Sequence, residues 1–332
     1  MALIIGGVAN DDYETPKIHL WDLDLTNYSE FKVTGPFTYG SNSLKSQVVI
    51  DTNRNEVWIG CSYDAVHCFD SITGAYKTTV QIYPLDTWWE SYSLNIQGDY
   101  LYVTFDDYKI HKINLNNRTV ISSTNIYGTA RGYGLNSSPT HLIVNANQAQ
   151  LQKYLISDMS YIESYSPSPP YVSIYYNSGF YFDGHVYCAH WNIPGAVIKY
   201  NIASNTATIY PYGTRQHYQV LVDETNGNIY SVIQEAVTGY AVVAKFDSNF
   251  NYLGNTIGTR SVSYFAGMCL DSANNKLYVI YSAGYIDKID ANTLITEKTS
   301  FSESGYSGGI VISTSLPISS ILMYKFRPVV LT

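Results

Sequence analysis

Residues 268–279 read Met-Cys-Leu-Asp-Ser-Ala-Asn-Asn-Lys-Leu-Tyr-Val, a short apolar run that ends in aspartate and resumes as another run containing an aromatic residue. Residues 48–59 and 220–231 follow the same pattern, with Asn or Gly four positions after the aspartate and an aromatic residue seven positions after it. Aspartate initiates turns by accepting backbone hydrogen bonds, and Asn or Gly tolerates the left-handed conformation that a tight hairpin needs. The pattern therefore predicts a β-hairpin in each segment.

A second pattern repeats along the chain. A large apolar residue, directly preceded by lysine in most copies, recurs at intervals of 48, 44, 41, 46, 46 and 43 residues. Its members are Trp21, Phe69, Ile113, Tyr154, Tyr200, Phe246 and Ile289. A period of about 44 residues with several short strands in each unit is typical of the blades of a β-propeller.

We therefore predict an all-β fold, with residues 1–332 as a single domain that forms a seven-bladed β-propeller of four-stranded antiparallel blades. Six complete blades are expected over about 46–304. Residues 1–35 hold too few strands for a blade of their own, and so do residues 306–332. We expect the two ends to combine into one closing blade, because a closed ring has no free sheet edges.

The repeats resemble those of the broad propeller superfamily with NHL, YVTN and PQQ-type repeats. The resemblance covers nearly the whole chain and implies the fold alone, because this architecture carries lyases, lactonases, dehydrogenases and binding proteins. Residues 70–74, Asp-Ser-Ile-Thr-Gly, resemble the Asp-x-x-Thr-Gly turn of PQQ-type repeats, but the tryptophan that normally follows is absent. We interpret this segment as a turn between the third and fourth strands, and we predict no cofactor.

Charge is sparse and tyrosine is abundant. The 19 Lys+Arg and 27 Asp+Glu residues make up 14% of the chain, against about 25% in a typical domain, while tyrosine alone contributes 33 residues. The net charge of −8 argues against nucleic acid as a partner. No apolar stretch is long enough to span a membrane, and the cysteine spacing does not suit a metal site, so we expect neither membrane insertion nor a bound metal.

The crossovers between blades are unusual. Gly-Thr-Arg followed by tyrosine occurs in residues 213–218 and 258–264, and a variant occurs in residues 128–133. We predict that these crossovers line one face around the channel, where aromatic walls and arginine forks would bind glycans or other proteins. The candidate binding residues are Arg131, Arg215, Arg260, Trp88, Trp89, Tyr92, Tyr133, Tyr171, His217, Tyr218, Tyr264 and Tyr306. The alternative is that these side chains fill gaps between blades and bond crossover carbonyls.

Other repeated polar residues favour packing over chemistry. For the lysines of the second pattern we expect the stem to cover a sheet face while the ammonium reaches water. These are Lys112, Lys153, Lys199, Lys245 and Lys288. His19, His67 and His111 share one repeat position, which again indicates packing. His217 is the best general-base candidate, but no carboxylate can be assigned to it, so we predict no catalytic residue.

Cys61 and Cys68 flank a short turn, residues 62–67, and could face each other across it. A disulfide is one interpretation, if the compartment is oxidising. The other is two buried free thiols, because free cysteine is commonly buried.

We predict a non-catalytic binding or structural protein. Sparse charge with many Tyr, Ser, Thr and Asn residues is typical of proteins that face the outside, and the leading hypothesis is a virion structural or host-attachment component, such as one of an archaeal virus. Residues 1–7 do not resemble a signal peptide, so release within a particle is the simplest route to the virion or cell exterior. The alternatives are a cytoplasmic protein-interaction scaffold and a lyase- or lactonase-like enzyme with its site at the channel mouth.

Overall fold

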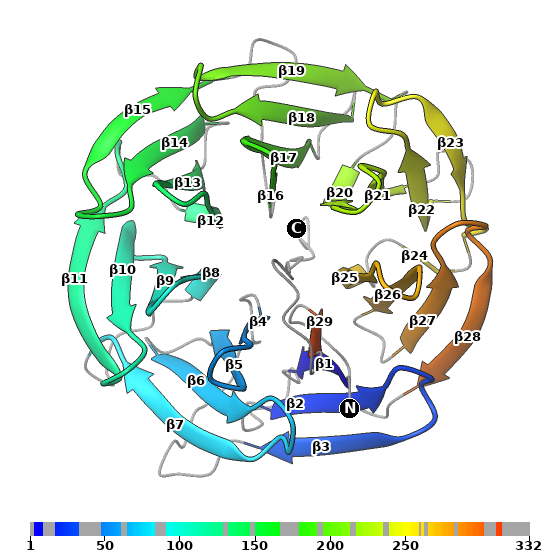
Figure 1. The fold of residues 1–332 in the computed structure, drawn as a ribbon, viewed down its shortest axis with the longest axis horizontal. Coiled ribbons are helices and arrows are strands. Elements are labelled where there is room, and N and C mark those ends of the chain that lie inside the picture. Colours follow the sequence, from blue (N-terminus) through cyan, green and yellow to red (C-terminus); the bar gives the residue numbers. More distant parts are fainter. Residues whose placement is uncertain are drawn as a thin grey trace.

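Short antiparallel strands are arranged in a ring in the computed structural model of the chain (Figure 1). The residues that the structure describes are 3–8, 17–32, 48–60, 65–83, 91–128, 132–146, 150–166, 179–190, 195–212, 217–234, 239–258, 260–261, 265–281, 285–301 and 310–313. Within these ranges, no helix has the length and apolarity that crossing a membrane would require.

Six sheets are each built from strands that follow one another in the chain. The first two contain β4 (Val48–Asp51), β5 (Glu56–Gly60), β6 (Ala65–Asp70) and β7 (Tyr76–Gln81), then β8 (Ser91–Gln97), β9 (Tyr100–Phe105), β10 (Lys109–Asn114) and β11 (Thr119–Asn125). The next two contain β12 (Gly132–Ser137), β13 (His141–Ala146), β14 (Gln150–Leu155) and β15 (Tyr161–Tyr165), then β16 (Phe180–Phe182), β17 (His185–His190), β18 (Ala196–Asn201) and β19 (Thr206–Pro211). The last two contain β20 (His217–Val222), β21 (Ile229–Gln234), β22 (Tyr240–Phe246) and β23 (Tyr252–Asn255), with β24 (Arg260–Ser261) added to β22, then β25 (Phe265–Asp271), β26 (Lys276–Tyr281), β27 (Tyr285–Asp290) and β28 (Thr296–Phe301).

A further sheet joins the two ends of the chain. It has the order β29 (Ile310–Ser313), β1 (Leu3–Val8), β2 (Lys17–Asp22), β3 (Tyr28–Lys32). Its inner pair is antiparallel, with Leu3 opposite Ser313 and Gly6 opposite Ile310. The predicted β-propeller of four-stranded antiparallel blades is therefore confirmed.

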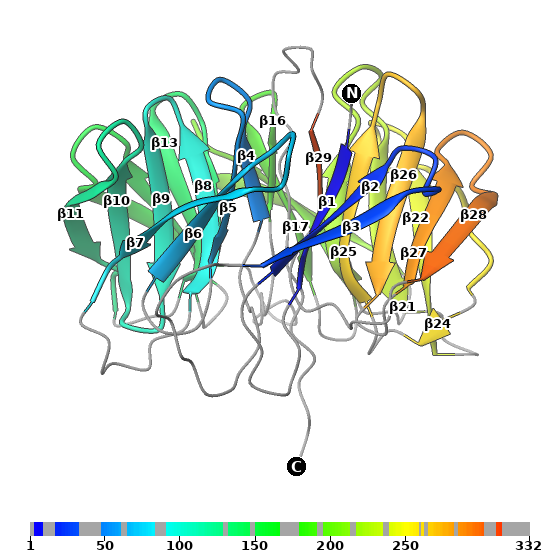
Figure 2. The same cartoon turned by 90° about the horizontal axis from the view of Figure 1, so that it is seen from below.

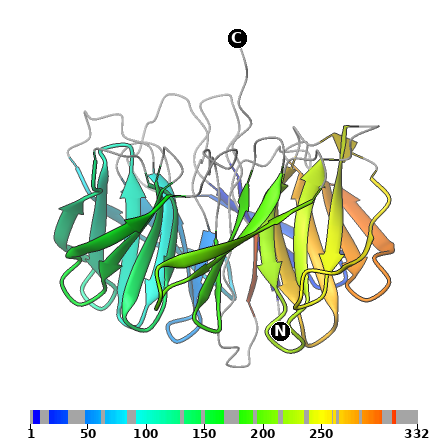
Figure 3. The same cartoon turned by 90° about the horizontal axis from the view of Figure 1, so that it is seen from above.

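Connectivity gives the ring two distinct faces. We call the strands of a sheet first to fourth, counted outward from the channel. Because neighbouring strands are antiparallel, the turns from first to second strand and from third to fourth strand reach one face, which we call the hairpin face. The second-to-third turns and the crossovers reach the opposite face, which we call the crossover face. Figures 2 and 3 show the ring edge-on, with the hairpin turns gathered on one side.

The predicted hairpins form as expected, and their turn chemistry is visible. Asp51 accepts hydrogen bonds from the backbone N–H groups of Asn53 and Arg54, at 3.0 and 3.2 Å. Asn55 follows in the left-handed region with a φ of 51°. Gly227 and Asn275 occupy the equivalent places at 75° and 53°. These turns therefore rest on contacts within about seven residues, which is why the sequence pattern alone finds them.

The core lies between blades and not within one. The second and third strands of a blade are mostly buried because each sheet packs against its two neighbours, and their buried residues are apolar with repeated polar exceptions such as Gln152 and Lys153. One such cluster includes Val49 and Trp58 from one blade and Leu94, Val103 and Phe105 from the next. The fourth strand is the outer edge, and β11 is exposed along most of its length.

The expectation that the repeated lysines reach water is wrong for Lys112, Lys153 and Lys245, whereas Lys199 and Lys288 are half-buried. Lys153 and Lys245 are buried, and their Nζ atoms donate to the main-chain oxygens of Ile202 and Ala291, at 2.8 and 2.9 Å. Lys112 makes the same kind of bond, at 3.4 Å, to the oxygen of Ile156. Each acceptor lies in the third-to-fourth turn of the next blade. Close packing of the blades places the ammonium under the neighbouring turn. There it donates to a main-chain carbonyl that has no donor within its own turn.

Cysteine is present as buried thiol in the described residues. Cys68, Cys188 and Cys269 are free and buried. Cys61 lies outside the described residues, so of the two interpretations of the Cys61 and Cys68 pair, the free thiol at Cys68 favours the one without a disulfide. Burial raises the pKa of the Cys188 thiol to about 12.

Candidate functional site

Two residues of the predicted binding face are not on a surface. His217 and Tyr218 begin strand β20 and are buried. The Nδ1 atom of His217 lies 2.8 Å from the hydroxyl oxygen of Ser231 on the adjacent strand, and the ring of Tyr212 packs edge-on against it at 6.1 Å. The prediction that these two side chains line a binding face is therefore corrected, and His217 is not at a solvent-filled mouth where a general base would meet a substrate.

The other predicted face residues remain predictions. Tyr92, Tyr133 and Arg260 are placed only by their backbones, in β8, β12 and β24. The remainder lie outside the described residues, and they are Arg131, Arg215, Trp88, Trp89, Tyr171, Tyr264 and Tyr306.

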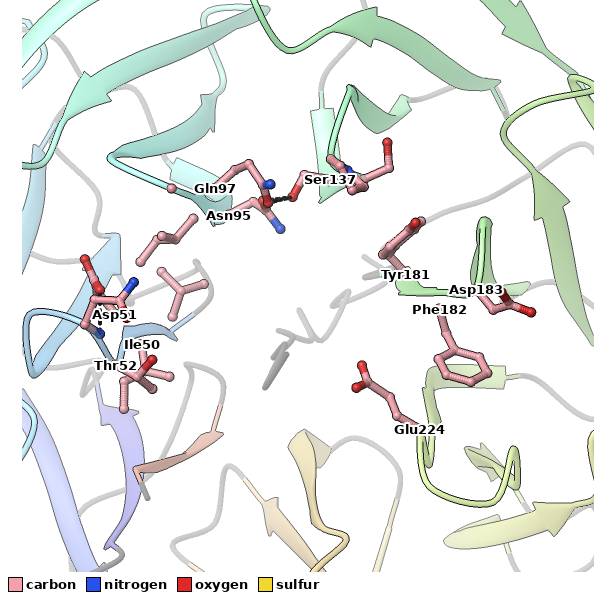
Figure 4. Close-up of a pocket in the computed structure, with 16 residues that line it drawn as sticks. Ile50, Asp51, Thr52, Asn95, Gln97, Ser137, Tyr181, Phe182, Asp183 and Glu224 are labelled. Atoms are coloured by element: carbon pink, nitrogen blue, oxygen red, sulfur yellow. Dashed lines mark hydrogen bonds between the residues drawn. The ribbon is translucent and has the colours of Figure 1, made fainter. Parts of the chain in front are cut away.

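A cavity of about 480 Å³ opens at the other end of the channel, on the hairpin face (Figure 4). It is lined by the ends of the first strands and by the first-to-second turns of five consecutive blades, those that begin with β4, β8, β12, β16 and β20. The volume falls within the range of about 300–1,000 Å³ that is usual for small-molecule sites. Because the turns are fixed by tight hairpins, the wall of the cavity is set by the scaffold.

The turn between β16 and β17 illustrates how the scaffold sets this wall. Asp183 and Gly184 both have positive φ, 46° and 74°, which is the geometry of a two-residue type I′ hairpin turn. The main-chain oxygen of Asp183 lies 2.6 Å from Nδ1 of His185, which holds the turn from the strand side. Phe182 and Asp183 thereby take fixed places in the lining of the cavity.

A chain of three uncharged polar groups forms one side of the cavity (Figure 4). The hydroxyl of Ser137 in β12 lies 2.6 Å from Oδ1 of Asn95 in β8 and 3.3 Å from Oε1 of Gln97. Asn95 is fully buried, and its Nδ2 atom has no hydrogen-bond partner among the described residues. A buried polar group without a partner costs about 1–3 kcal/mol of folding free energy. This amide is therefore held at the cavity wall at a cost to stability.

The charged side chains in the described lining of the cavity are acidic. Its described lining includes the carboxyl groups of Asp51, Asp183 and Glu224, and it includes no Lys, Arg or His side chain. The carboxylate of Asp51 is partly neutralised, because Nη1 of Arg54 lies 2.7 Å from its Oδ2. Such a site favours uncharged hydrogen-bonding ligands or cations and disfavours carboxylates, sulfates and phosphates.

Sequence reasoning missed this cavity because it looked for aromatic and charged residues in long loops. The available signal was a polar residue inside an apolar first strand, as in Leu94-Asn95-Ile96. In a strand packed on both faces, such a residue indicates a position where packing is not the only constraint.

The histidines with well-defined partners are packed inside blades. His67 lies 2.6 Å from the hydroxyl of Thr79 on the next strand, and burial lowers the pKa of His67 to about 4. His111 lies 3.0 Å from Oδ2 of Asp107 in a buried pair. Burial acts to raise the pKa of Asp107, but hydrogen bonds from His111 and Tyr83 outweigh it, so the pKa lies below its usual range. No group of three or more His, Cys, Asp or Glu residues within the described ranges is arranged to hold a metal ion.

Comparison with known proteins supports the fold alone. No protein-family profile matches the sequence. No curated protein is similar to it in sequence. Among solved structures, the chain is similar to the computationally designed propeller Ika8, with a TM-score of 0.64 and 11% identity, covering 92% of this chain and 86% of the designed one. In all, 1611 chains of solved structures match, so the architecture is common and does not by itself select a function.

Proposed function

We propose that this chain is a non-catalytic β-propeller that binds a ligand or partner through the hairpin-face cavity. The observation that carries the proposal is the wall of Asn95, Ser137 and Gln97, in which a fully buried amide group lies at the cavity without a partner in the described part of the chain. A buried polar group without a partner in the chain calls for an explanation, and a bound molecule that supplies the missing hydrogen bond is the one we propose. The surrounding turns are rigid, so the wall is already organised for binding before a ligand arrives.

The state of the described titratable groups supports a role without catalysis. His217 is buried against Ser231, and His67 is buried against Thr79. The thiol of Cys188 is buried, with a pKa raised to about 12 by desolvation. Nucleophilic and acid–base catalysis need side chains that reach the substrate, which these buried groups do not. A lyase- or lactonase-like activity therefore ranks behind binding.

We also propose that the ring has seven blades and that the sheet of β29 with β1, β2 and β3 is the closing blade. The pairing of β1 with β29 supports this. The contacts between this sheet and the blade of β25–β28 support it as well. The hydroxyl of Tyr278 donates to the main-chain oxygen of Leu23 at 2.9 Å, and Nζ of Lys288 donates to Asp24 at 2.8 Å. The tyrosine contact repeats the bond that Tyr230 makes to the next blade, and the lysine reaches the same turn but bonds a carboxylate in place of a main-chain oxygen.

A cross-link tests the closing blade. Ile5 and Val311 are paired across β1 and β29, so cysteines at both positions should oxidise to a disulfide and raise the melting temperature. The single Ile5→Cys variant is the control. Failure of the double variant to cross-link in the folded protein would contradict the closure.

The setting in which we propose that binding occurs is the outside of a virion or cell, as a structural or host-attachment component. Sparse charge supports this, with 33 tyrosines against 19 basic residues, because an uncharged surface depends little on pH and salt. The cytoplasmic scaffold is the alternative. Detection of the chain in purified particles, together with its binding to intact host cells, would support the exterior role. A protein found only inside cells and bound to soluble partners would exclude it.

A bulky substitution tests whether the cavity is the binding site. Thr52 lines the cavity, and Thr52→Trp should fill part of it. Asn292→Trp is the matched control, because Asn292 is exposed in a third-to-fourth turn of the same face but away from the channel. We expect Thr52→Trp to abolish binding to particles or cells and Asn292→Trp to leave it unchanged. Equal binding by both variants would place the site elsewhere.

A further inference from the structure

We infer that the cavity on the hairpin face recognises an uncharged, hydroxyl-rich ligand, namely a neutral sugar residue of a glycan. The inference rests on the proposed binding function and specifies its ligand. Three features of the described residues carry it: the unpartnered amide of Asn95, the absence of a cationic side chain from the described lining, and the apolar surface beside both.

The Asn95 amide selects for a group that both donates and accepts hydrogen bonds. With its oxygen toward the Ser137 hydroxyl, the amide presents its Nδ2 donor to the cavity, which is the orientation drawn in Figure 4. Rotated by half a turn, it would present an acceptor instead, and Ser137 would still donate to Gln97. A sugar hydroxyl satisfies the amide in either orientation, because it carries one donor and two acceptor sites. An ammonium group satisfies only the second orientation, because it has no acceptor.

The charges of the described lining disfavour an acidic sugar. Asp183 and Glu224 contribute carboxyl groups, and no described side chain that lines the cavity is positively charged. A sialic acid carboxylate or a sulfate ester would enter against like charge and would lack the forked cation that proteins normally supply for it. Carboxylates do accept hydrogen bonds from hydroxyl groups, so the same residues suit a neutral sugar.

The cavity also offers apolar surface for the carbon face of a sugar ring. The half-buried side chains of Ile50, Ile96 and Phe182 lie in the lining, alongside the amides and hydroxyls. Binding sites for small molecules commonly combine such apolar walls with a few fixed polar groups that set orientation. The mixture here therefore matches a ring that is apolar on its faces and polar around its edge.

A near-isosteric substitution separates a binding role of Asn95 from a structural one. Asn95→Leu removes the amide and leaves the bond between Ser137 and Gln97 possible. If the amide serves a ligand, the variant should bind neutral glycans at least about 10-fold more weakly, while its melting temperature stays the same or rises. Asn249→Leu, in an exposed third-to-fourth turn, is the control and should bind like the wild type.

The experiment uses the full chain against an array of neutral oligosaccharides and their sialylated and sulfated counterparts. Titration calorimetry with the best neutral binder and with spermidine as an amine probe follows. Binding of neutral glycans, weakened by Asn95→Leu and by Thr52→Trp, supports the inference. Selective binding of acidic glycans, or of spermidine in place of sugars, overturns it. Binding to cells or particles without any glycan binding overturns this inference alone, whereas loss of all binding overturns the proposed function as well.

Discussion

Two interfaces between blades solve the same packing problem with different residues. Between the blade of β20–β23 and that of β25–β28, Lys245 lies opposite Tyr230 and reaches the next blade, where both bond the main-chain oxygen of Ala291. Between the blade of β4–β7 and that of β8–β11, the position equivalent to Lys245 is Cys68, opposite Trp58. No lysine is available there to reach forward.

The next blade supplies the missing cation. Arg118, in the turn between β10 and β11, reaches back so that its guanidinium lies 4.9 Å from the centre of the Trp58 ring. Lys245 lies at 5.7 Å from the ring of Tyr230. At both interfaces a cation therefore stands over the aromatic residue of the second strand, whichever blade provides it. The comparison teaches that the repeat preserves the place of the charge and not the residue that carries it.

The two solutions differ in what they leave buried. Arg118 binds both oxygens of Glu56, a carboxylate that is only 4% exposed, with one bond at 2.9 Å. Lys245 instead shares a neutral carbonyl with a second donor, the hydroxyl of Tyr230. Removing one partner of a buried ion pair strands the other charge, whereas removing one of two donors leaves a carbonyl still bonded. The arginine interface should therefore be the more sensitive one.

The largest effect is expected from Arg118→Met. The change keeps most of the apolar stem but leaves the buried carboxylate of Glu56 with Lys77, at 3.8 Å, as its one charged partner among the described residues. We expect a loss of about 3 kcal/mol in the free energy of unfolding, measured by urea denaturation. Adding Glu56→Gln should recover much of that loss, because no charge is then stranded. A loss below about 1 kcal/mol would show that the pair contributes no more than a surface ion pair.

Acid should weaken the blade of β4–β7 through His67. Its folded-state pKa of about 4 lies below the unfolded value of about 6.5, so the unfolded chain binds the proton more readily. The contribution of His67 to the free energy of unfolding is therefore fully present above pH 6.5. It is lost as the pH drops toward 4, by up to roughly 3 kcal/mol. Denaturation at pH 7 and at pH 4.5 measures this, and His67→Gln should show a smaller pH dependence. An unchanged dependence in that variant would assign the effect to other groups.

At the lysine interface we expect smaller, coupled effects. Lys245→Met and Tyr230→Phe should each cost about 1 kcal/mol or less, because the other donor still satisfies Ala291. The double variant leaves that carbonyl without either donor. Its loss in the free energy of unfolding should exceed the sum of the two single losses by about 1 kcal/mol. A double-mutant cycle by urea denaturation measures this coupling. Strict additivity would mean that the two bonds are independent.

The smallest effect concerns the thiol beneath Arg118. Burial, with the nearby charge of Glu56, raises the pKa of Cys68 above its usual range, so little thiolate forms at neutral pH. We expect no alkylation by iodoacetamide at pH 8 in the native protein and complete reaction in urea, followed by mass spectrometry. Faster native labelling of Cys68 in Arg118→Met, with Cys188 unchanged, would show that the arginine keeps this particular interface closed.

Much of the fold could be predicted because the hydrogen bonds that form its turns join residues close together in the sequence. The aspartate of each hairpin and the Asn or Gly four positions later act on their own turn, as the φ values of Asn55, Gly227 and Asn275 show. The turn at residues 70–74 also forms as the sequence indicates, with Gly74 at a φ of 74° and Asp70 bonded to the N–H of Thr73 at 2.8 Å. These contacts span only a few residues, so a pattern of the same length encodes them.

The candidate site could not be predicted in the same way. The sequence placed His217 and Tyr218 on an exposed face, but strand β20 begins at His217, three residues before the apolar run that starts at Val220, and both side chains are buried. The wall of the cavity joins Asn95 with Ser137, which are 42 positions apart and come from separate blades. No local pattern specifies that pairing.

By itself, the sequence determined the repeat, the hairpins and hence the β-propeller class, because hydrogen bonding within a hairpin depends on neighbouring residues. Only the tertiary structure decided which atoms the ammonium groups of the repeated lysines contact. It also decided which blade supplies the cation where Cys68 replaces the lysine, and which end of the channel holds a cavity lined by Asn95. Those outcomes depend on contacts between blades, about 45 residues apart in a repeat of this period. At that separation the partner of a side chain is set by how the sheets pack, and the order of residues within one repeat does not contain it.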